Sequence, residues 1–220
     1  MEHLTKSGQI VVLNGTPRSG KSSIVAAIQE TFDGPWMNLG VDAFVRHITP
    51  RCYRPGIGLR PGGEHPELEP LVPVFYAGMY ESIAAHSRLG LNVVVDVGHH
   101  DAYIHPRGIL AESARRLAGL PVLFVGVLCP IEAIMERRNA GQAGREDEYA
   151  TGSAVDSVPL PVRLWQREVH IPGIYDLEVD TSLLSPAECA EVIQRRLEEG
   201  PPPTVFQQLA ERLASKEPVE

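Results

Sequence analysis

The chain of 220 residues is predicted to adopt an α/β fold, in which a doubly wound sheet of five parallel strands lies between layers of helices. Three observations predict this fold. Short runs of apolar, mainly β-branched residues alternate with segments of helical periodicity. A glycine-rich pattern over residues 15–22 joins the first run to the first helical segment. Acidic residues follow the next two runs, where the carboxyl ends of parallel strands would lie.

Five segments are expected to form the strands. Four are continuous apolar runs, typical of parallel strands buried on both faces, and the fifth alternates polar and apolar residues, as an edge strand does. The segments are residues 10–13, 36–42, 92–98, 122–129 and 175–180. The second ends at Asp42, and Asp96 lies at the carboxyl end of the third. Right-handed crossovers should bring both carboxylates to the edge of the sheet that holds the glycine-rich loop.

Helical segments fill the intervals between these strands. We expect helices at residues 23–32, 73–88, 107–118, from 130 onward, and at 160–170, 185–199 and 204–217. Ser185-Pro186-Ala187-Glu188 has the signature of a capping box with proline at the first helical position. Gly200 and the three prolines after it should end that helix. The sequence therefore predicts one domain over residues 1–200 and a C-terminal helical extension over 201–220.

Two segments lack a regular pattern. Residues 46–70 combine many prolines and glycines with arginines and aromatic residues, which suits a mobile loop over a substrate. A surface excursion without a role is the alternative. Residues 138–157 begin in a helix and continue with small, polar and charged residues, typical of a flexible lid.

Composition excludes several classes of partner. The formal net charge is −8 and no run of lysine and arginine occurs, which argues against a large nucleic-acid surface. The longest apolar run, residues 122–129, is too short to span a membrane, and residues 1–9 show no secretory signal. Three widely spaced cysteines favour reduced thiols. We therefore expect a cytoplasmic protein without nucleic-acid or membrane partners, in which the last helix could form a homo-oligomer contact.

The clearest chemistry lies in the phosphate-binding pattern from Gly15 to Ser22. The glycines allow successive backbone N–H groups to approach phosphate oxygens, and the helix that follows adds its positive dipole end. Lys21 would neutralise the β- and γ-phosphates, and the Ser22 hydroxyl would bind Mg²⁺. The expected ligands are therefore ATP and Mg²⁺. The predicted nucleotide contacts are Gly15, Thr16, Pro17, Arg18, Ser19, Gly20, Lys21, Ser22 and Ser23 in the loop, with Arg137 from a later helix.

Two carboxylates and a group of arginines are candidates for phosphoryl transfer. Asp42 could accept the proton of an acceptor hydroxyl, and Asp96 could hold Mg²⁺ through water and contact the substrate. Each could instead cap a helix. Arg137, Arg138 and Arg145 flank the lid-like segment, where an arginine could stabilise transition-state charge, although some of them should be solvated helix residues.

A histidine-rich turn follows the third strand. His99, His100, Asp101 and His105 do not show the i, i+4 spacing of helical zinc ligands, and no cysteine joins them. The expectation is that they line a substrate pocket or are polar loop residues. His99, His100 and Arg54 are accordingly candidate contacts of the acceptor, together with Asp42 and Asp96.

Four blocks of the chain together resemble the chloramphenicol phosphotransferase-like family of P-loop kinases, over about residues 9–198. The blocks are Leu13 to Gly15 with Gly20-Lys21-Ser22, Trp36 to Asp42, Val122 to Cys129 followed by Arg137, and His170 with Tyr175 to Thr181. The resemblance implies an adenylate-kinase-like P-loop kinase domain over residues 1–200. It also implies transfer of the ATP γ-phosphate to a hydroxyl of an antibiotic such as chloramphenicol.

The same resemblance implies roles for single residues. Asp42 would be the base, Lys21 and Ser22 would bind phosphate and Mg²⁺, Arg137 would be the arginine beside the lid, and Asp180-Thr181 would lie by the adenine. The chain departs from the founding enzyme after Asp96, where it reads Val-Gly-His-His-Asp, in the content of 46–70, and in the tail after 200. These parts should contact the acceptor, so the resemblance extends to the reaction and not to the substrate.

Three functions follow as hypotheses. The first is an antibiotic kinase that phosphorylates an alcohol positioned by Asp42. The second is a kinase of a metabolite, such as a sugar acid, nucleotide or sugar nucleotide, on the same fold. The third is a nucleotide-dependent switch or binding module, against which the chain lacks the Asn-Lys-x-Asp motif of guanine specificity.

Overall fold

The computed structural model describes residues 6–63, 65–141, 151–153 and 155–214, and within these it contains the predicted five-stranded parallel sheet. The strands are β1 (Ile10–Asn14), β2 (Trp36–Asn38), β3 (Asn92–Val97), β4 (Val122–Leu128) and β5 (Leu177–Asp180). Their order is β2-β3-β1-β4-β5, and every neighbouring pair is parallel. The chain therefore reverses its winding direction at β1, where ligands of such sheets bind.

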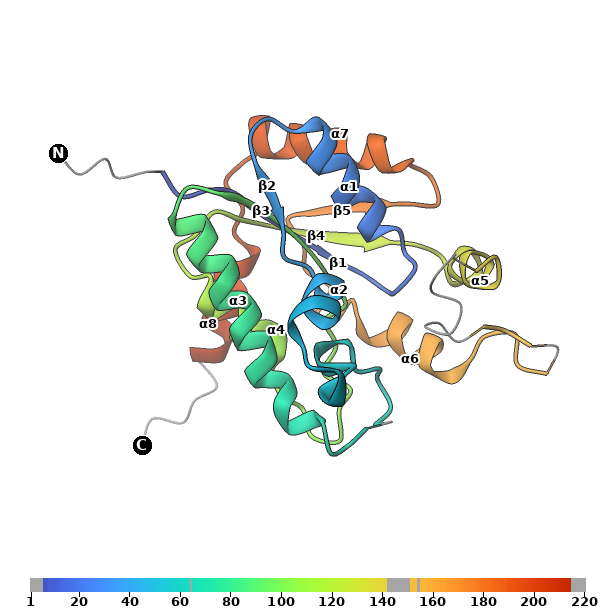
Figure 1. Cartoon of the computed structure of the whole chain (residues 1–220). Helices are drawn as coiled ribbons and strands as arrows, with labels where there is room; N and C mark the ends of the chain where they lie inside the picture. Colours follow the sequence, from blue (N-terminus) through green and yellow to red (C-terminus); the bar gives the residue numbers. More distant parts are fainter. Residues whose placement is uncertain (1–5, 64, 142–150, 154, 215–220) are drawn as a thin grey trace.

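Helices cover both faces of this sheet (Figure 1). The helices are α1 (Lys21–Thr31), α2 (Val41–Ala43), α3 (Val72–Arg88), α4 (Ile109–Arg116), α5 (Ile131–Asn139), α6 (Leu160–Glu168), α7 (Pro186–Glu199) and α8 (Val205–Ala214). One face carries α1 and α7, and the opposite face carries α3, α4 and α8. The predicted capping box at Ser185 and Glu188 is formed in full at the start of α7.

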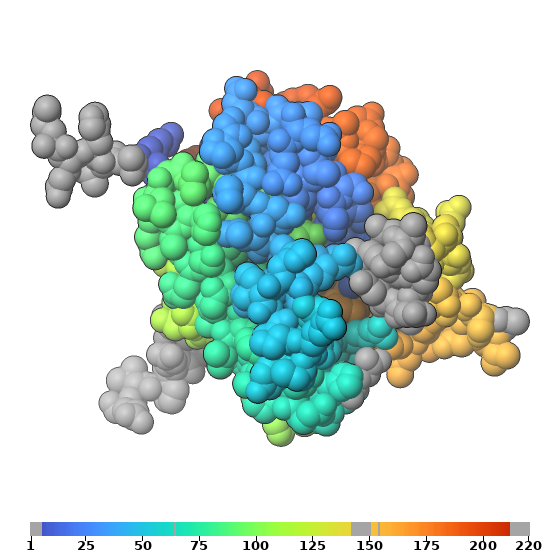
Figure 2. All heavy atoms as spheres, in the orientation of Figure 1, coloured from blue at the N-terminus to red at the C-terminus, as the bar shows by residue number. Residues whose placement is uncertain are grey.

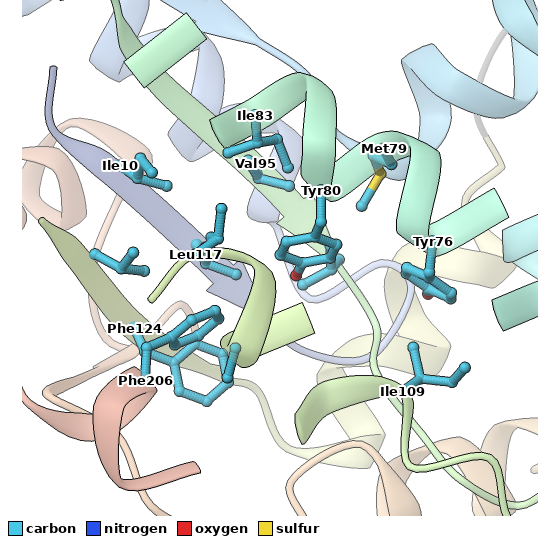
Figure 3. Packing of buried hydrophobic residues seen from close by; sticks show 14 of the residues in the cluster. Ile10, Tyr76, Met79, Tyr80, Ile83, Val95, Ile109, Leu117, Phe124 and Phe206 are labelled. Atoms are coloured by element: carbon cyan, nitrogen blue, oxygen red, sulfur yellow. The ribbon is translucent and has the colours of Figure 1, made fainter. Parts of the chain in front are cut away.

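The two faces hold separate apolar clusters. Residues of β1 alternate between them, so Ile10 belongs to the cluster below α3 and Val11 to the one below α1. Figure 3 shows the first cluster, in which Tyr80 of α3 lies beside strand residues and Phe206 of α8 lies against Phe124 of β4. The rings of Phe124 and Phe206 are 5.1 Å apart and inclined at 71°. Helix α8 therefore completes the main core, which was not predicted from its place after Gly200.

The second strand is shorter than predicted. β2 ends at Asn38, and the chain then turns at Gly40 into α2, so Asp42 lies in a helical turn and not at the end of a strand. The turn is possible because Leu39 still donates its backbone N–H to Val94, while Gly40 donates to the Asn38 side chain. Smaller differences occur elsewhere: the helices predicted at 107–118 and 160–170 and the strand predicted at 175–180 are each shorter.

The segment after Asp42 is built from short helical turns. These are Phe44–Ile48, Arg51–Tyr53, Gly56–Gly58 and Glu69–Leu71. Two side chains from the main fold fix its middle part, because Tyr76 donates its hydroxyl to the Ile57 carbonyl at 3.3 Å and His100 Nε2 lies 2.9 Å from the Leu59 carbonyl. The segment predicted as a mobile loop over 46–70 therefore contains several helical turns, and we call residues 44–63 and 65–71 the folded wall. Figure 2 shows it between α3 and α6.

Within the described part of the chain, no helix combines the length and apolarity needed to cross a membrane. Half of the predicted lid over 138–157, including Arg145, lies outside the described residues.

Candidate active site

A cavity of about 1130 Å³ opens at the carboxyl edge of the sheet. The glycine-rich loop and the start of α1 form one side of it, and the folded wall after Asp42 forms another. Side chains from α5, α6 and the end of β5 complete the lining, among them Arg137, Trp165 and Thr181. The cavity is large enough for a nucleotide together with a small second molecule.

Backbone geometry explains the glycines of the loop. A Cβ on Gly15 would lie 2.5 Å from the Val127 carbonyl oxygen, so no other residue fits between β1 and β4. Gly20 has a φ of 96°, and Arg18 adopts a positive φ of 76° as well. These angles turn the chain back on itself immediately before α1, which places the helix N-terminus at the cavity.

Lys21 lies inside the loop that precedes it. Its ammonium group donates hydrogen bonds to the carbonyls of Gly15 at 2.7 Å and Thr16 at 2.9 Å. Burial lowers the pKa of Lys21 to about 8, although the carboxylates of Asp96 and Asp42 act in the opposite direction. The lysine is therefore held beside the place for phosphate and would gain further charge stabilisation from a bound anion.

Ser22 and Asp96 meet at the floor of the cavity. The Ser22 hydroxyl donates to Asp96 Oδ2 at 2.8 Å, and both residues line the cavity. Burial raises the pKa of the Asp96 carboxyl, and nearby Lys21 and Ser22 counteract this rise. A hydroxyl and a carboxylate are oxygen donors of the kind that Mg²⁺ prefers alongside phosphate oxygens and water, so the residues present fit that ion. Asp96 does not cap a helix, because it lies within β3.

Asp42 faces the same cavity from α2. Its negative charge raises the pKa of both Lys21 and Asp96, in each case less than burial shifts it. Gly40 is the N-cap residue of α2, so the structure does not bear out the alternative role of Asp42 as a cap. The glycine is needed there, since a Cβ at position 40 would lie 1.7 Å from Asp96 Oδ1.

Arg137 joins three parts of the site. Its guanidinium donates to the Thr181 hydroxyl at 3.1 Å, the Thr181 carbonyl at 2.7 Å and the sulfur of Cys129 at 3.3 Å. Thr181 in turn donates to the Ser19 carbonyl at 2.7 Å. Arg137 thus lines the cavity and also ties the ends of β4 and β5 to the loop. Its neighbour Arg138 is 4% exposed and donates to the Pro17 carbonyl, so it is not a solvated helix residue.

The histidines of the turn after β3 do not line the cavity. His99 is buried, with Nε2 2.7 Å from the Tyr80 hydroxyl, and burial lowers its pKa to about 3. His100 is buried against Tyr103 and Trp165, and burial lowers its pKa too. Neither buried position supports the predicted contact of these histidines with the acceptor, so that contact stays a prediction. Arg54, the remaining candidate from sequence, does line the cavity.

Two polar residues that sequence reasoning did not single out hold the site together. Asn14 is buried at the end of β1, where its side chain donates to the Val169 carbonyl at 2.7 Å and accepts from the His99 backbone N–H at 2.9 Å. Gln166 of α6 accepts from the Thr16 hydroxyl at 2.6 Å and donates to the Cys129 carbonyl at 3.0 Å. The sequence feature that could have pointed to such a residue was the polar Asn14 at the end of an otherwise apolar strand.

The described residues contain no cluster of three or more histidine, cysteine, aspartate or glutamate side chains suited to a metal ion. A phosphate-binding loop at the winding reversal of a parallel sheet, above a serine and a carboxylate, instead defines the fold and site of a P-loop kinase. The chain belongs to the chloramphenicol phosphotransferase-like family, whose family model matches residues 8–198.

Comparison with other proteins agrees with this class. Two strains of Mycobacterium tuberculosis carry a relative named Putative O-phosphotransferase, which is 26% identical over 223 residues, covering 94% of this chain and 90% of the relative. Among solved structures, the M. tuberculosis APS kinase CysC in complex with AMPPNP and APS covers 88% of this chain and 99% of its own, with 19% identity and a TM-score of 0.57.

A gluconokinase from Sinorhizobium meliloti 1021 covers 97% of this chain and 99% of its own, with 20% identity and a TM-score of 0.53. At these identities the solved structures show the fold alone. Family and fold together make the chain a small-molecule phosphotransferase of the P-loop kinase type.

Proposed function

We propose that this enzyme transfers the γ-phosphoryl group of ATP to a hydroxyl group of a small molecule, with Asp42 as the base. The observation that supports this most directly is the position of Asp42, which lines the same cavity as the phosphate-binding loop and whose charge acts on both Lys21 and Asp96. A carboxylate there can orient an acceptor hydroxyl and take its proton as the oxygen attacks phosphorus.

The other side chains supply position and charge. The backbone N–H groups from Gly15 to Ser22 would cradle the phosphates, and Lys21 would neutralise the β- and γ-oxygens. Ser22 and Asp96 would hold Mg²⁺, which would supply neutralisation of phosphate charge when bound. Arg137, close to Gly20 and Thr181, would stabilise the transferring group from the side of α5. Phosphoryl transfer through a loose transition state needs little more from a protein than positioning of the reactants and stabilisation of their charge.

The family makes chloramphenicol, or a related antibiotic-like alcohol, the first acceptor to test, and resistance the corresponding role. A metabolite is the second candidate. It is favoured by Arg54, which the segment after Asp42 contributes to the cavity lining and whose guanidinium would suit an anionic group on the acceptor. Both candidates use the same reaction and the same base.

The Asp42→Asn variant tests the reaction. Loss of the base should lower the rate of transfer by roughly a hundredfold to ten-thousandfold, while ATP binding, measured by calorimetry, stays unchanged. Asp33→Asn, on an exposed residue after α1, is the matched control and should keep full activity. Transfer at the normal rate by Asp42→Asn would refute the base. Absence of transfer by the wild-type enzyme to every alcohol offered would favour a nucleotide-dependent binding module.

A further inference from the structure

We propose that the indole N–H of Trp165 donates a hydrogen bond to the γ-phosphoryl group of the bound nucleotide, and that Trp165 therefore helps Lys21 to hold the group that is transferred. The inference rests on the proposed function and adds a nucleotide-binding residue to it. It follows from the place of Trp165 in the cavity, from an indole nitrogen that lacks a partner, and from the attachment of α6 to the phosphate-binding loop.

Trp165 lies in the cavity wall beside one end of the phosphate-binding loop. It lines the cavity together with Gly98 of the turn after β3. A Cβ on Gly98 would lie 3.2 Å from Trp165 Nε1 and 3.2 Å from the Gly15 carbonyl oxygen. That carbonyl accepts a hydrogen bond from the Lys21 ammonium group at 2.7 Å. The indole nitrogen and the carbonyl that holds the lysine therefore flank the same glycine.

The two ends of the loop have different neighbours. At the helix end, a Cβ on Gly20 would lie 3.4 Å from Thr181 Cγ2 and 3.6 Å from Arg137 Nη1. Trp165 and the ammonium group of Lys21 lie at the opposite end. A lysine in this pattern contacts the β- and γ-phosphates, so a donor beside it faces the terminal part of a triphosphate. The γ-phosphoryl group is also the part that must meet the acceptor in the cavity.

The indole nitrogen has no hydrogen-bond partner within the part of the chain that the structure describes. Trp165 is 9% exposed, and its Nε1 is enclosed without an acceptor among those residues. An indole nitrogen only donates, so its partner must supply a lone pair. An enclosed donor without a partner is unfavourable, and packing alone would be served by an aromatic ring without a polar atom. The N–H is therefore available to a phosphoryl oxygen.

Helix α6 fixes the ring close to the loop. The next residue, Gln166, accepts from the Thr16 hydroxyl at 2.6 Å and donates to the Cys129 carbonyl at 3.0 Å. The rings of Trp165 and His100 meet edge-on, with centroids 5.8 Å apart and planes inclined at 85°. The backbone of Trp165 is thus held in place, and a small turn of the side chain brings the N–H into the cavity that the ring already lines.

An anionic oxygen favours this turn. A hydrogen bond to a charged acceptor is about twice as strong as one between neutral groups, and it gives the indole N–H the partner that it lacks. ADP carries no γ-phosphoryl group and leaves the indole in its enclosed position. The contact of Trp165 therefore distinguishes a nucleoside triphosphate from a diphosphate.

The Trp165→Phe variant tests the contact, because it keeps an aromatic ring and removes the N–H. The dissociation constants of AMPPNP and of ADP, each with Mg²⁺, are measured by calorimetry without an acceptor. The ratio of the two constants reports what the γ-phosphoryl group contributes to binding. The preference for AMPPNP over ADP should fall about ten- to a hundredfold, the range expected for a hydrogen bond to a charged group, and the affinity for ADP should not change.

Trp36→Phe is the matched control. Trp36 is the other tryptophan of the chain, is 7% exposed, and also has an indole nitrogen without a partner among the described residues. It packs against Phe32, with ring centroids 5.3 Å apart, and is not part of the cavity lining. The same substitution at this position should therefore keep the full preference for AMPPNP.

Fluorescence gives a second readout that does not need the Trp165→Phe variant to fold. In Trp36→Phe, Trp165 is the remaining tryptophan. Its emission should change when AMPPNP with Mg²⁺ saturates the enzyme, and it should not change with ADP and Mg²⁺. Identical emission in the two saturated complexes would overturn the proposed contact.

The outcomes separate this inference from the proposed function. If Trp165→Phe weakens AMPPNP and ADP equally, or leaves both unchanged, the inference is wrong even when alcohols are phosphorylated with Asp42 as the base. A loss confined to the KM of an acceptor also overturns it. If the preference for AMPPNP depends on Trp165 while no alcohol is phosphorylated, the inference is supported and the proposed reaction is not.

Discussion

The hydroxyl of Ser22 and the carboxylate of Asp96 lie 2.8 Å apart, although 74 positions separate them in the chain. The parallel pairing of β1 with β3, in which Leu13 lies opposite Asp96, brings them together. This pairing places an acidic side chain beside the first turn of the helix that follows the phosphate-binding loop. The proposed Mg²⁺ site is thus a consequence of strand register.

Asp96→Asn should weaken Mg²⁺ binding and so raise the Mg²⁺ concentration that the reaction requires. The amide keeps the size of the side chain and removes its charge, so the Mg²⁺ concentration for half-maximal transfer should rise about 10- to 100-fold. Titration of activity with Mg²⁺ at fixed ATP measures this. Asp33→Asn serves as the control, and an unchanged titration for Asp96→Asn would exclude Asp96 from the metal site.

Gly40→Ala should disturb the same carboxylate by steric contact alone. Gly40 has an extended backbone that alanine can adopt, but the added Cβ would lie 1.7 Å from Asp96 Oδ1. We expect a loss of roughly 1–3 kcal/mol in the free energy of unfolding and a clear rise in the Mg²⁺ requirement. Gly78→Ala is the control, because a Cβ there meets nothing within 4 Å, and in helix α3 it should add about 0.5–1 kcal/mol. Equal stability of the two variants would contradict the predicted contact.

Arg137→Lys should show that Arg137 has a structural as well as a chemical role. Lysine keeps the charge but cannot reach both the hydroxyl and the carbonyl of Thr181 with a planar fork. The variant should lose about 1–3 kcal/mol of stability in urea unfolding and bind ATP more weakly. A variant that unfolds like the wild type and loses only kcat would instead confine Arg137 to the transition state.

His99 should make the protein sensitive to acid. Its pKa is about 3 in the fold, against 6.5 for an exposed histidine, because burial opposes the charged form. Between these pH values the unfolded chain binds the additional proton. Titration of His99 therefore leaves the free energy of unfolding unchanged above about pH 6.5. Below that pH the free energy of unfolding falls by up to about 1.4 kcal/mol per pH unit.

Urea unfolding at several pH values checks this against His99→Gln, which keeps a polar partner for Tyr80 and does not titrate. The difference between the two pH profiles isolates His99 from His100, His170 and the carboxylates, which also titrate. His105→Gln, on an exposed histidine of the same turn, should leave the profile as it is. Parallel profiles for wild type and His99→Gln would refute the assignment.

Features that depend on neighbouring residues were predictable from sequence. The phosphate-binding loop is contiguous, the five strands are short apolar runs, and the capping box at Ser185 needs only four residues. Asp42 was expected beside the loop and does face the same cavity, although its element is a helical turn. Asp42 was predicted at the end of the second strand. The strand ends earlier, because only the three residues Trp36–Asn38 pair with β3.

Features that depend on distant residues were not predictable. The partners of Asn14 and Thr16 in the segment around α6 are 155 and 150 positions away, so neither hydrogen bond has a local pattern. His99 and His100 looked like pocket residues because they are polar and follow a strand. Their actual environment is set by tyrosines of α3 and by the folded wall, which only the three-dimensional packing reveals.

Helix α8 lies beyond the stretch of 8–198 that defines the family, yet Val205, Phe206 and Leu209 are at most 6% exposed in the main core. A chain shortened to the family boundary would leave the ring of Phe124 uncovered on the outer side of β4. Such a fragment would expose an apolar strand face to other copies of the chain and would aggregate. Helix α8 thus covers part of the core of this protein, and recombinant versions should retain the chain through residue 214.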